Sequence, residues 1–245
     1  MVGSYTPMID MRSFPTTTRP PRKLLVFARI PEKHRVKTRL AADIGADRAL
    51  EIYRAMVEDV LEAIGECDDE LDIDLAWTAS SEIEGSAIAA LSGNRHPVMQ
   101  SGRDLGERLV VAFSERVVFQ PTEAIVAIGV DDPALTREHV LCAFRLLESC
   151  EWVVGPAADG GYYLIGCRAG AFHPSVFEKI DWGTSRVFSQ TEESIRALGA
   201  TLAVLPERFD LDLAGDLERL AGSDGAAAPR VRALLERWKG EASSE

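Results

Sequence analysis

The chain has 245 residues, of which 46% are hydrophobic and 27% charged, proportions typical of a soluble globular protein rather than a disordered one. Its 27 lysine and arginine residues against 39 aspartate and glutamate residues give a net charge of −12, which argues against a general nucleic-acid-binding surface. No apolar run approaches the ~18–20 residues that a membrane span needs. Four scattered cysteines lack zinc or redox spacing, so reduced thiols and a cytoplasmic location are expected.

The charges are unevenly distributed along the chain. Residues 1–40 hold nine basic side chains against only Asp10 and Glu32, while the rest of the chain is strongly acidic. A basic segment on an acidic body is either a solvated tail or a small anion-binding site, and its surroundings have to decide between the two.

The first half of the chain alternates strands with helices. Residues 1–22, rich in Pro, Thr, Ser and Arg, predict a flexible leader. Apolar runs then predict strands over residues 23–29, 74–78 and 124–130, and helical spacing predicts helices over 46–65, 81–91, 105–119 and 136–149. The strand over 124–130 is apolar throughout, as an interior parallel strand should be.

After residue 150 the pattern changes. Two short strands, 152–155 and 162–166, flank the turn residues Asp159-Gly160-Gly161 and predict a hairpin. A helix over 185–198, a strand over 202–205 and helices over 213–221 and 229–238 follow. The sequence therefore predicts one α/β domain over residues 23–240, with a mostly parallel central sheet, flanking helices and a small antiparallel portion.

A basic segment follows the first strand directly. It contains Arg29, Arg35, Lys37 and Arg39, without the glycine patterns of a P-loop or a dinucleotide fingerprint. Ligands of open parallel sheets bind beyond the carboxyl ends of the strands, so these side chains are placed to bind a diphosphate. The alternative is a solvated basic loop.

Carboxylates follow the strand over 124–130. Asp131 is placed to hold Mg²⁺ or Mn²⁺, hard cations that share oxygen ligands with substrate phosphates. The alternative is an Asp-Pro turn that starts the next helix. In a late acidic stretch, Asp210 or Asp212 is a candidate second ligand, whereas Asp216 is expected in the first turn of a helix.

In this order, the motifs resemble a known family. They are residues 155–166 (GPAADGGYYLIG), 36–40 (VKTRL), 104–108 (DLGER), Asp131, Trp182 with Thr184, and the late aspartates. They resemble the bacterial GT-A-like transferases of the nucleotide-diphospho-sugar transferase superfamily, known as radical-SAM/selenodomain-associated transferases. The resemblance spans residues 23–220 and implies a GT-A-like, Rossmann-like fold. The family has Pro and Gly where this chain has Lys33 and His34, which leaves the tight backbone geometry of that loop open.

The resemblance also implies a reaction and a set of roles. A nucleotide-diphospho-sugar would bind with Mg²⁺ or Mn²⁺, and its glycosyl group would pass to an unknown acceptor. Asp159 is the candidate general base. The other expected roles are metal binding by Asp131 and Asp212, nucleotide and phosphate binding by Arg29, Arg35, Lys37, Arg39, Asp104 and Gly106, and an acceptor pocket bordered by Gly160, Gly161, Trp182 and Thr184.

Two alternatives remain open from the sequence. Molybdenum-cofactor and phospholactate guanylyltransferases have similar layouts, so nucleotidyl transfer from a nucleoside triphosphate competes with glycosyl transfer. The absence of glycine between Arg29 and Arg39 favours glycosyl transfer, because a backbone cradle for a triphosphate usually contains glycine. A nucleotide-binding module without catalysis is the third possibility. The base, the sugar, the acceptor and the oligomeric state are not predicted.

Overall fold

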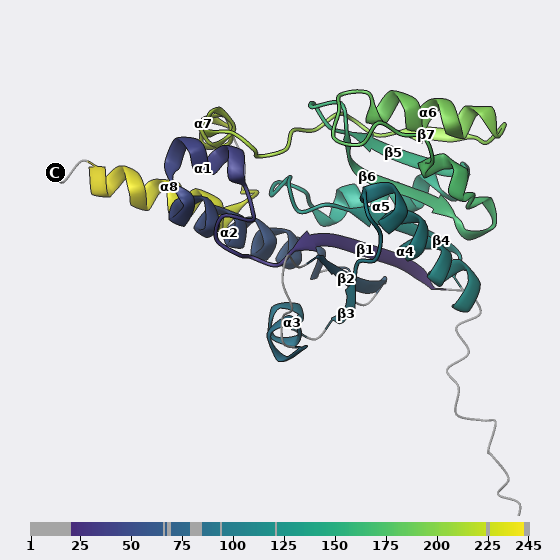
Figure 1. The fold of residues 1–245 in the computed structure, drawn as a ribbon, viewed down its shortest axis with the longest axis horizontal. Coiled ribbons are helices and arrows are strands. Elements are labelled where there is room, and N and C mark those ends of the chain that lie inside the picture. Colours follow the sequence, from purple (N-terminus) through teal and green to yellow (C-terminus); the bar gives the residue numbers. More distant parts are fainter. Residues whose placement is uncertain are drawn as a thin grey trace, which may run out of the picture.

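A seven-stranded sheet lies at the centre of the described chain, in the strand order β3-β2-β1-β4-β6-β5-β7 (Figure 1). The structure is a computed structural model, and it describes residues 21–65, 67, 70–78, 85–93, 95–120, 122–223 and 226–242. The strands are β1 (Arg22–Arg29), β2 (Asp72–Thr78), β3 (His96–Met99), β4 (Ala124–Ile128), β5 (Trp152–Pro156), β6 (Tyr162–Arg168) and β7 (Leu202–Val204).

Most neighbouring strands are parallel. β1 pairs in parallel with β2 and β4, β2 with β3, and β5 with β7. Among the described strands, β6 alone is antiparallel to its neighbours, β4 and β5. The carboxyl ends of β1 to β4 and the amino end of β6 therefore meet at one edge of the sheet. This mostly parallel α/β sheet with a small antiparallel part confirms the fold class predicted from the sequence.

Helices cover both faces of the sheet. They are α1 (Thr38–Ile44), α2 (Ala46–Gly65), α3 (Gly85–Ser92), α4 (Leu105–Phe119), α5 (Arg137–Leu146), α6 (Val187–Ala197), α7 (Ala214–Gly222) and α8 (Pro229–Ala242), with 3₁₀ turns η1 (Ala169–Ala171) and η2 (Pro174–Phe177). None of the helices in the described part of the chain has the length and apolarity that crossing a membrane requires.

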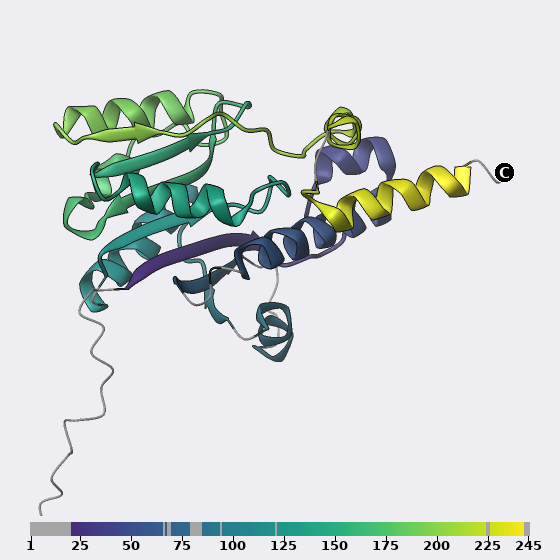
Figure 2. The same ribbon diagram turned by 180° about the vertical axis from the view of Figure 1, so that it is seen from behind.

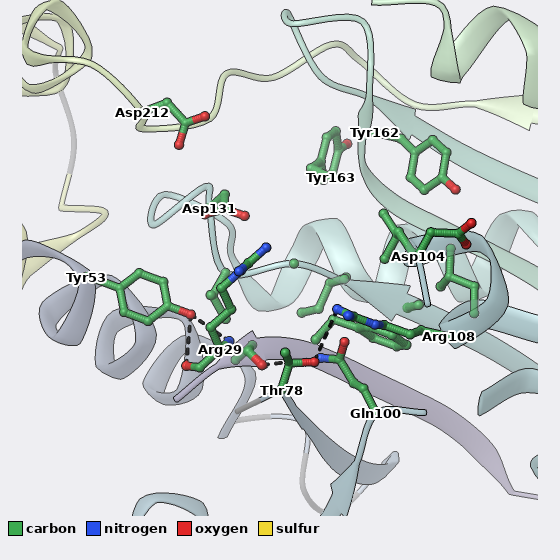
Figure 3. A pocket seen from close by; sticks show the side chains of 18 of the residues that line it. Arg29, Tyr53, Thr78, Gln100, Asp104, Arg108, Asp131, Tyr162, Tyr163 and Asp212 are labelled. Atoms are coloured by element: carbon green, nitrogen blue, oxygen red, sulfur yellow. Dashed lines mark hydrogen bonds between the residues drawn. The ribbon is translucent and has the colours of Figure 1, made fainter. Parts of the chain in front are cut away.

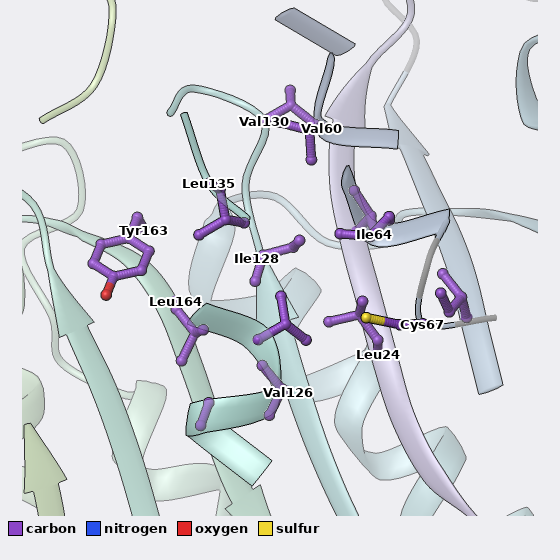
Figure 4. Packing of buried hydrophobic residues seen from close by; sticks show 14 of the residues in the cluster. Leu24, Val60, Ile64, Cys67, Val126, Ile128, Val130, Leu135, Tyr163 and Leu164 are labelled. Carbon is purple, nitrogen blue, oxygen red and sulfur yellow. The ribbon is translucent and has the colours of Figure 1, made fainter. Parts of the chain in front are cut away.

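The alternation of side chains along β1 divides the core into two layers. Leu24 and Leu25 are both fully buried, but they point to opposite faces because successive residues of a strand do so. Leu24 packs in a cluster with residues of α2 and α5 (Figure 4), and Leu25 in a second cluster with residues of α4 and α6. Each fully buried leucine contributes about 1.5–3 kcal/mol through the hydrophobic effect.

A third cluster builds a helical lobe from α1, α7, α8 and part of α2 (Figure 2). Leu40 of α1, Ile52 and Met56 of α2, and Val231 of α8 are buried in it. Leu211, which precedes α7, is fully buried in the same cluster and thereby anchors the segment that carries Asp212.

Two elements were not predicted, and two predicted segments cannot be compared in full. The sequence analysis assigned no helix to α1 and no strand to β3. α1 has seven residues with only Leu40 buried, and β3 is a four-residue edge strand that contains Pro97. Residues 1–20 of the predicted leader, and 81–84 of the predicted helix over 81–91, lie outside the described residues.

Candidate functional site

A pocket of about 620 Å³ opens at the carboxyl ends of β1 and β4 and the amino end of β6 (Figure 3). Open parallel sheets bind ligands at this edge. Of the residues predicted for the site, seven line this one pocket: Arg29, Arg35, Lys37, Arg39, Asp104, Asp131 and Asp212.

Tyr53 of α2 fixes the end of β1 where the basic residues begin. Its hydroxyl accepts a hydrogen bond from the Arg29 backbone N–H at 2.8 Å and donates one to the Arg29 carbonyl oxygen at 3.0 Å. Burial raises the pKa of Tyr53, so the hydroxyl keeps its proton. The Arg29 side chain is exposed, but Tyr53 fixes its backbone through both the N–H and the carbonyl group.

The basic segment makes tight turns without glycine. His34 has φ +64° and Lys37 has φ +45°, both in the left-handed region that favours glycine. Each such residue costs about 1–2 kcal/mol, which the surrounding structure has to offset. The tight loop geometry that the sequence left open is thus formed by His34 and Lys37 themselves.

Lys37 lies between the two carboxylates that were predicted as metal ligands. Its Nζ donates to Asp131 Oδ1 at 2.5 Å and to Asp212 Oδ1 at 2.7 Å. The Lys37 side chain is only 3% exposed, against 51% for Asp131 and 40% for Asp212. Burial opposes its charge, but the two carboxylates outweigh burial and raise the pKa of Lys37 above 10.5. Lys37 is therefore a cation at the bottom of the site.

Asp210 adds a third acidic group near this pair. Burial, and then the charges of Asp131 and Asp159, raise its pKa from 3.8 to about 7. This carboxyl therefore keeps its proton to a higher pH than an ordinary aspartate does.

Hydrogen bonds hold together the two loops that carry these acids. The Leu211 backbone N–H donates to the Asp131 carbonyl oxygen at 2.8 Å. Arg208 forms an ion pair with the buried Asp132 and donates from Nη2 to the Ala134 carbonyl oxygen at 2.9 Å. The segment after β4 and the segment before α7 therefore keep a fixed spacing.

Asp216 organises the start of α7, in whose first turn it lies. Its Oδ2 accepts from the backbone N–H groups of Asp212 at 2.9 Å and Leu213 at 2.8 Å. This side chain caps the helix and orients Asp212, in agreement with the helix-turn position expected from the sequence.

Two carboxylates in the pocket are the candidate ligands for a divalent cation. Among the described residues, no three His, Cys, Asp or Glu side chains form a metal-binding group. Asp131 and Asp212 offer two carboxylates, and Mg²⁺ is often bound by one or two carboxylates with water and substrate phosphates completing the shell. Because Lys37 Nζ contacts one oxygen of each, the second oxygens or a displaced Lys37 would have to accommodate the ion.

Of the two residues predicted near the nucleotide, Asp104 lines the pocket and Gly106 does not. Asp104 lines the pocket and caps α4, its Oδ1 accepting from the Glu107 N–H at 2.9 Å. Gly106 lies outside the pocket lining, and a Cβ there would meet Trp182 Nε1 at 2.5 Å. Its position serves the close contact between α4 and the Trp182 ring.

The residues predicted around the acceptor lie behind the lining of the pocket. Trp182 packs edge-on against Tyr162, with ring centroids 6.3 Å apart, and Tyr162 itself lines the pocket. Thr184 Oγ1 donates to the Asp181 carbonyl oxygen in a turn. Trp182 therefore supports the pocket wall from outside, whereas Thr184 stabilises the turn that follows it.

The Asp159-Gly160-Gly161 turn also lies outside the lining. Asp159 is exposed, and its Oδ1 accepts from the Gly161 N–H at 2.8 Å. Gly160 has φ +89°, and a Cβ there would lie 2.2 Å from the Ser185 carbonyl oxygen. The glycine thus permits close packing of the hairpin against the start of α6, while Asp159 is near enough to Asp210 to raise its pKa.

Several pocket residues had no prediction. They are Tyr53, Thr78, Gln100, Arg103, Arg108, Tyr162 and Tyr163. The spacing of Tyr53 indicated only a core position in a helix. Gln100 follows β3, and the sequence predicted no strand there. Arg108 and the two tyrosines stood inside the motifs on which the family resemblance rests, and that was the signal that could have found them.

The chain is similar in sequence and structure to several known proteins. A structure of a candidate nucleotide-diphospho-sugar transferase from Desulfovibrio desulfuricans G20 matches with 30% identity and a TM-score of 0.82, over 89% of this chain and 95% of that chain. The 2-phospho-L-lactate guanylyltransferase of Haloarcula marismortui is 29% identical over 197 residues, which are 78% of this chain and 83% of the relative.

More distant structures share the fold. The 4-diphosphocytidyl-2C-methyl-D-erythritol synthase of Anaerococcus prevotii matches with a TM-score of 0.54 and 11% identity, over 89% of this chain and 96% of that chain. The family model of uncharacterized proteins conserved in bacteria, DUF2064, matches residues 60–184. With its GT-A-like fold of the nucleotide-diphospho-sugar transferase superfamily, the chain belongs to the DUF2064 family.

Proposed function

We propose that this protein is a nucleotide-dependent transferase, and specifically a nucleotidyltransferase that joins a nucleoside monophosphate to an acidic acceptor. The observation that carries the proposal is the pocket at the sheet edge, which is lined by Arg29, Arg35 and Arg39 together with the carboxylates of Asp131 and Asp212. Within the described residues, the three arginines form no ion pair, so their charge is available to phosphate groups.

One observation favours nucleotidyl over glycosyl transfer, and a second removes an argument against it. The guanylyltransferase relative covers most of this chain. The glycine-free loop no longer counts against nucleotidyl transfer, because His34 and Lys37 take the left-handed conformations for which glycine was thought necessary.

In the proposed reaction, an acceptor oxygen attacks the α-phosphorus of a nucleoside triphosphate. The new P–O bond forms as the bond between the α-phosphorus and the bridging oxygen to the β-phosphate breaks, and pyrophosphate leaves with the electron pair. Arg29, Arg35 and Arg39 bind the phosphates and neutralise the charge that develops on the leaving group. Tyr53 keeps Arg29 in place.

Asp131 and Asp212 are the residues that would hold Mg²⁺ or Mn²⁺, which supplies Lewis-acid stabilisation to phosphate oxygens when bound. Lys37 balances the two carboxylates and, if it leaves them, provides an ammonium for a phosphate. An acceptor would approach past Tyr162 and Tyr163, and Trp182 packs behind the Tyr162 ring. Asp159, the base expected from the sequence, lies outside the pocket lining and has no step in this reaction.

Pyrophosphate release tests the proposal. Purified protein is incubated with each nucleoside triphosphate, Mg²⁺ or Mn²⁺, and a panel of phosphorylated sugars and phosphorylated hydroxy acids. We expect metal-dependent pyrophosphate release that is lost in Asp131→Ala and kept in Arg196→Ala, an exposed arginine outside the pocket. If no nucleoside triphosphate binds or reacts, the proposed function is wrong.

Glycosyl transfer is the second candidate, because the similar structure from Desulfovibrio desulfuricans is described as a candidate nucleotide-diphospho-sugar transferase. It breaks the bond between the sugar and the diphosphate and releases a nucleoside diphosphate. Nucleoside diphosphate release from a nucleotide-sugar, without pyrophosphate release from any triphosphate, would decide for this candidate.

A further inference from the structure

Gln100 presents a fixed hydrogen-bond acceptor at the end of the pocket away from Asp212 (Figure 3). Its Nε2 donates to the carbonyl oxygens of Ala76 at 2.6 Å and Ala28 at 3.3 Å. Two carbonyl neighbours require the amine on that side, so the amide oxygen faces the pocket. Among the described residues this oxygen has no hydrogen-bond partner.

Arg108 supplies donors beside this acceptor. Its Nε donates to the Gly102 carbonyl oxygen at 3.1 Å, and its Nη1 approaches Thr78 Oγ1 at 3.4 Å. Thr78 is two residues beyond Ala76 on β2, so it shares a face of the sheet with the residue that orients Gln100. The guanidinium has five N–H donors, and these two contacts leave three of them for a ligand.

The strands set the distance from this acceptor to the acidic end. The strands β3, β2, β1 and β4 are neighbours in that order. At their carboxyl ends lie Gln100 after β3, Thr78 and Arg29 as the last residues of β2 and β1, and Asp131 after β4. Three steps of about 4.8 Å separate the outer two, about 14 Å in all. A nucleotide with its phosphates at the acidic end extends its base toward Gln100.

We infer that Gln100 and Arg108 bind the base of the nucleotide and select guanine, an inference that rests on the proposed function. Glutamine recognises adenine with both its amide oxygen and its amine, but the amine of Gln100 is already bonded to two backbone carbonyls. Guanine offers N1–H and the 2-amino group to the remaining oxygen, and its O6 and N7 are the acceptors that arginine prefers.

Calorimetric binding to the wild-type protein is the first test. GTP, ITP, ATP, UTP and CTP are titrated with Mg²⁺ present. We expect GTP to bind about tenfold or more tightly than ATP, since one hydrogen bond lost from a buried partner corresponds to about this factor. ITP, which lacks the 2-amino group, should bind between the two. This arm does not depend on the folding of any variant.

The second test uses variants within the same pocket. Gln100→Leu and Arg108→Ala should reduce the preference for GTP over ATP about tenfold, whereas Arg103→Ala should leave it unchanged. Arg103 lines the pocket too, but its guanidinium is paired with Glu107. Nucleotides that bind without base preference, or a GTP preference that survives both substitutions, overturn the inference and leave the proposed function intact. Absence of binding by every nucleotide overturns the proposed function, and the inference with it.

Discussion

Lys37 shows how one residue can differ from its prediction and still belong to the site. The sequence placed it among phosphate donors, and the structure places it between Asp131 and Asp212, 94 and 175 residues away in the chain. No spacing rule connects positions so far apart, so the contact could not be predicted. An ammonium between two carboxylates relieves their mutual repulsion.

Lys37→Met tests the contribution of this ammonium. We expect nucleotide affinity to fall about tenfold or more, because a hydrogen bond to a charged group contributes about 1.5–3 kcal/mol. Calorimetric titration of a nucleoside triphosphate measures the change, with Arg196→Ala as a control that removes a charge elsewhere. Unchanged affinity in Lys37→Met would limit Lys37 to holding the two aspartates.

His139 predicts a pH dependence of stability. Its Nδ1 accepts a hydrogen bond from the Thr136 backbone N–H at 3.1 Å, and its Nε2 lies 2.8 Å from Arg208 Nη1. Burial and then the Arg208 charge lower the pKa of His139 below 6.5. The unfolded chain therefore binds a proton before the folded chain does, and this contribution to stability is lost as the pH falls below about 6.5.

His139→Gln removes the titrating group and keeps a donor and an acceptor. Its free energy of unfolding, measured with urea between pH 5 and 8, should fall less than that of the wild type on the acid side. The gap is on the order of 1 kcal/mol for each unit by which the pKa is lowered. His173→Gln, at an exposed histidine, controls for the substitution. Parallel curves for wild type and His139→Gln would contradict the prediction.

At the scale of elements, long apolar patterns were predictable and short or polar ones were not. The continuous apolar run of β4 arises because both faces of this strand are buried. The helical spacing of apolar residues in α2 arises because one face of this helix is buried. β3 and α1 bury too few side chains to leave such a pattern, and their formation depends on neighbours in the fold. Gln100 was missed with β3, whereas Asp131 was found because it follows the clearest strand.

The packing of the hairpin turn on α6 gives a prediction at this scale. Gly160→Ala should lower the free energy of unfolding by at least about 2 kcal/mol, since the new Cβ meets a backbone carbonyl in addition to the strain of φ +89°. Gly183→Ala is the matched control, with φ +78° and nothing within 4 Å, and should cost about 1–2 kcal/mol. Urea denaturation compares the two. Equal losses would show that the close contact has no energetic weight.

At the scale of the molecule, the candidate site lies between the central sheet and the helical lobe. Asp131 extends from the sheet, while Asp212 is next to Leu211 of the helical lobe. The order of elements predicted from the sequence placed both segments correctly along the chain. It did not predict that α1, α7 and α8 would form a core with α2, because helices of similar amphipathicity can pack in several ways.

A ligand that bridges the sheet and the helical lobe should slow local opening at their junction. With nucleoside triphosphate and Mn²⁺ at ~100 times the dissociation constant, the free energy of unfolding should rise by about 2.7 kcal/mol. Hydrogen exchange should slow most in residues 129–135 and 207–213. Asp131→Ala should lose the part of this protection that depends on Mn²⁺. Protection confined to the sheet would show that Asp212 takes no part in binding.

The order of the strands also fixes the distance between Gln100 and the carboxylate of Asp131. Gln100 and Asp131 follow β3 and β4, and backbone hydrogen bonds set the separation of these strands. A nucleoside monophosphate held by its base at Gln100 ends short of the carboxylates, and each further phosphate brings the chain of charges closer to them. If the base binds at Gln100 as inferred, affinity should increase from mono- to di- to triphosphate, because each added phosphate comes closer to the groups around Asp131.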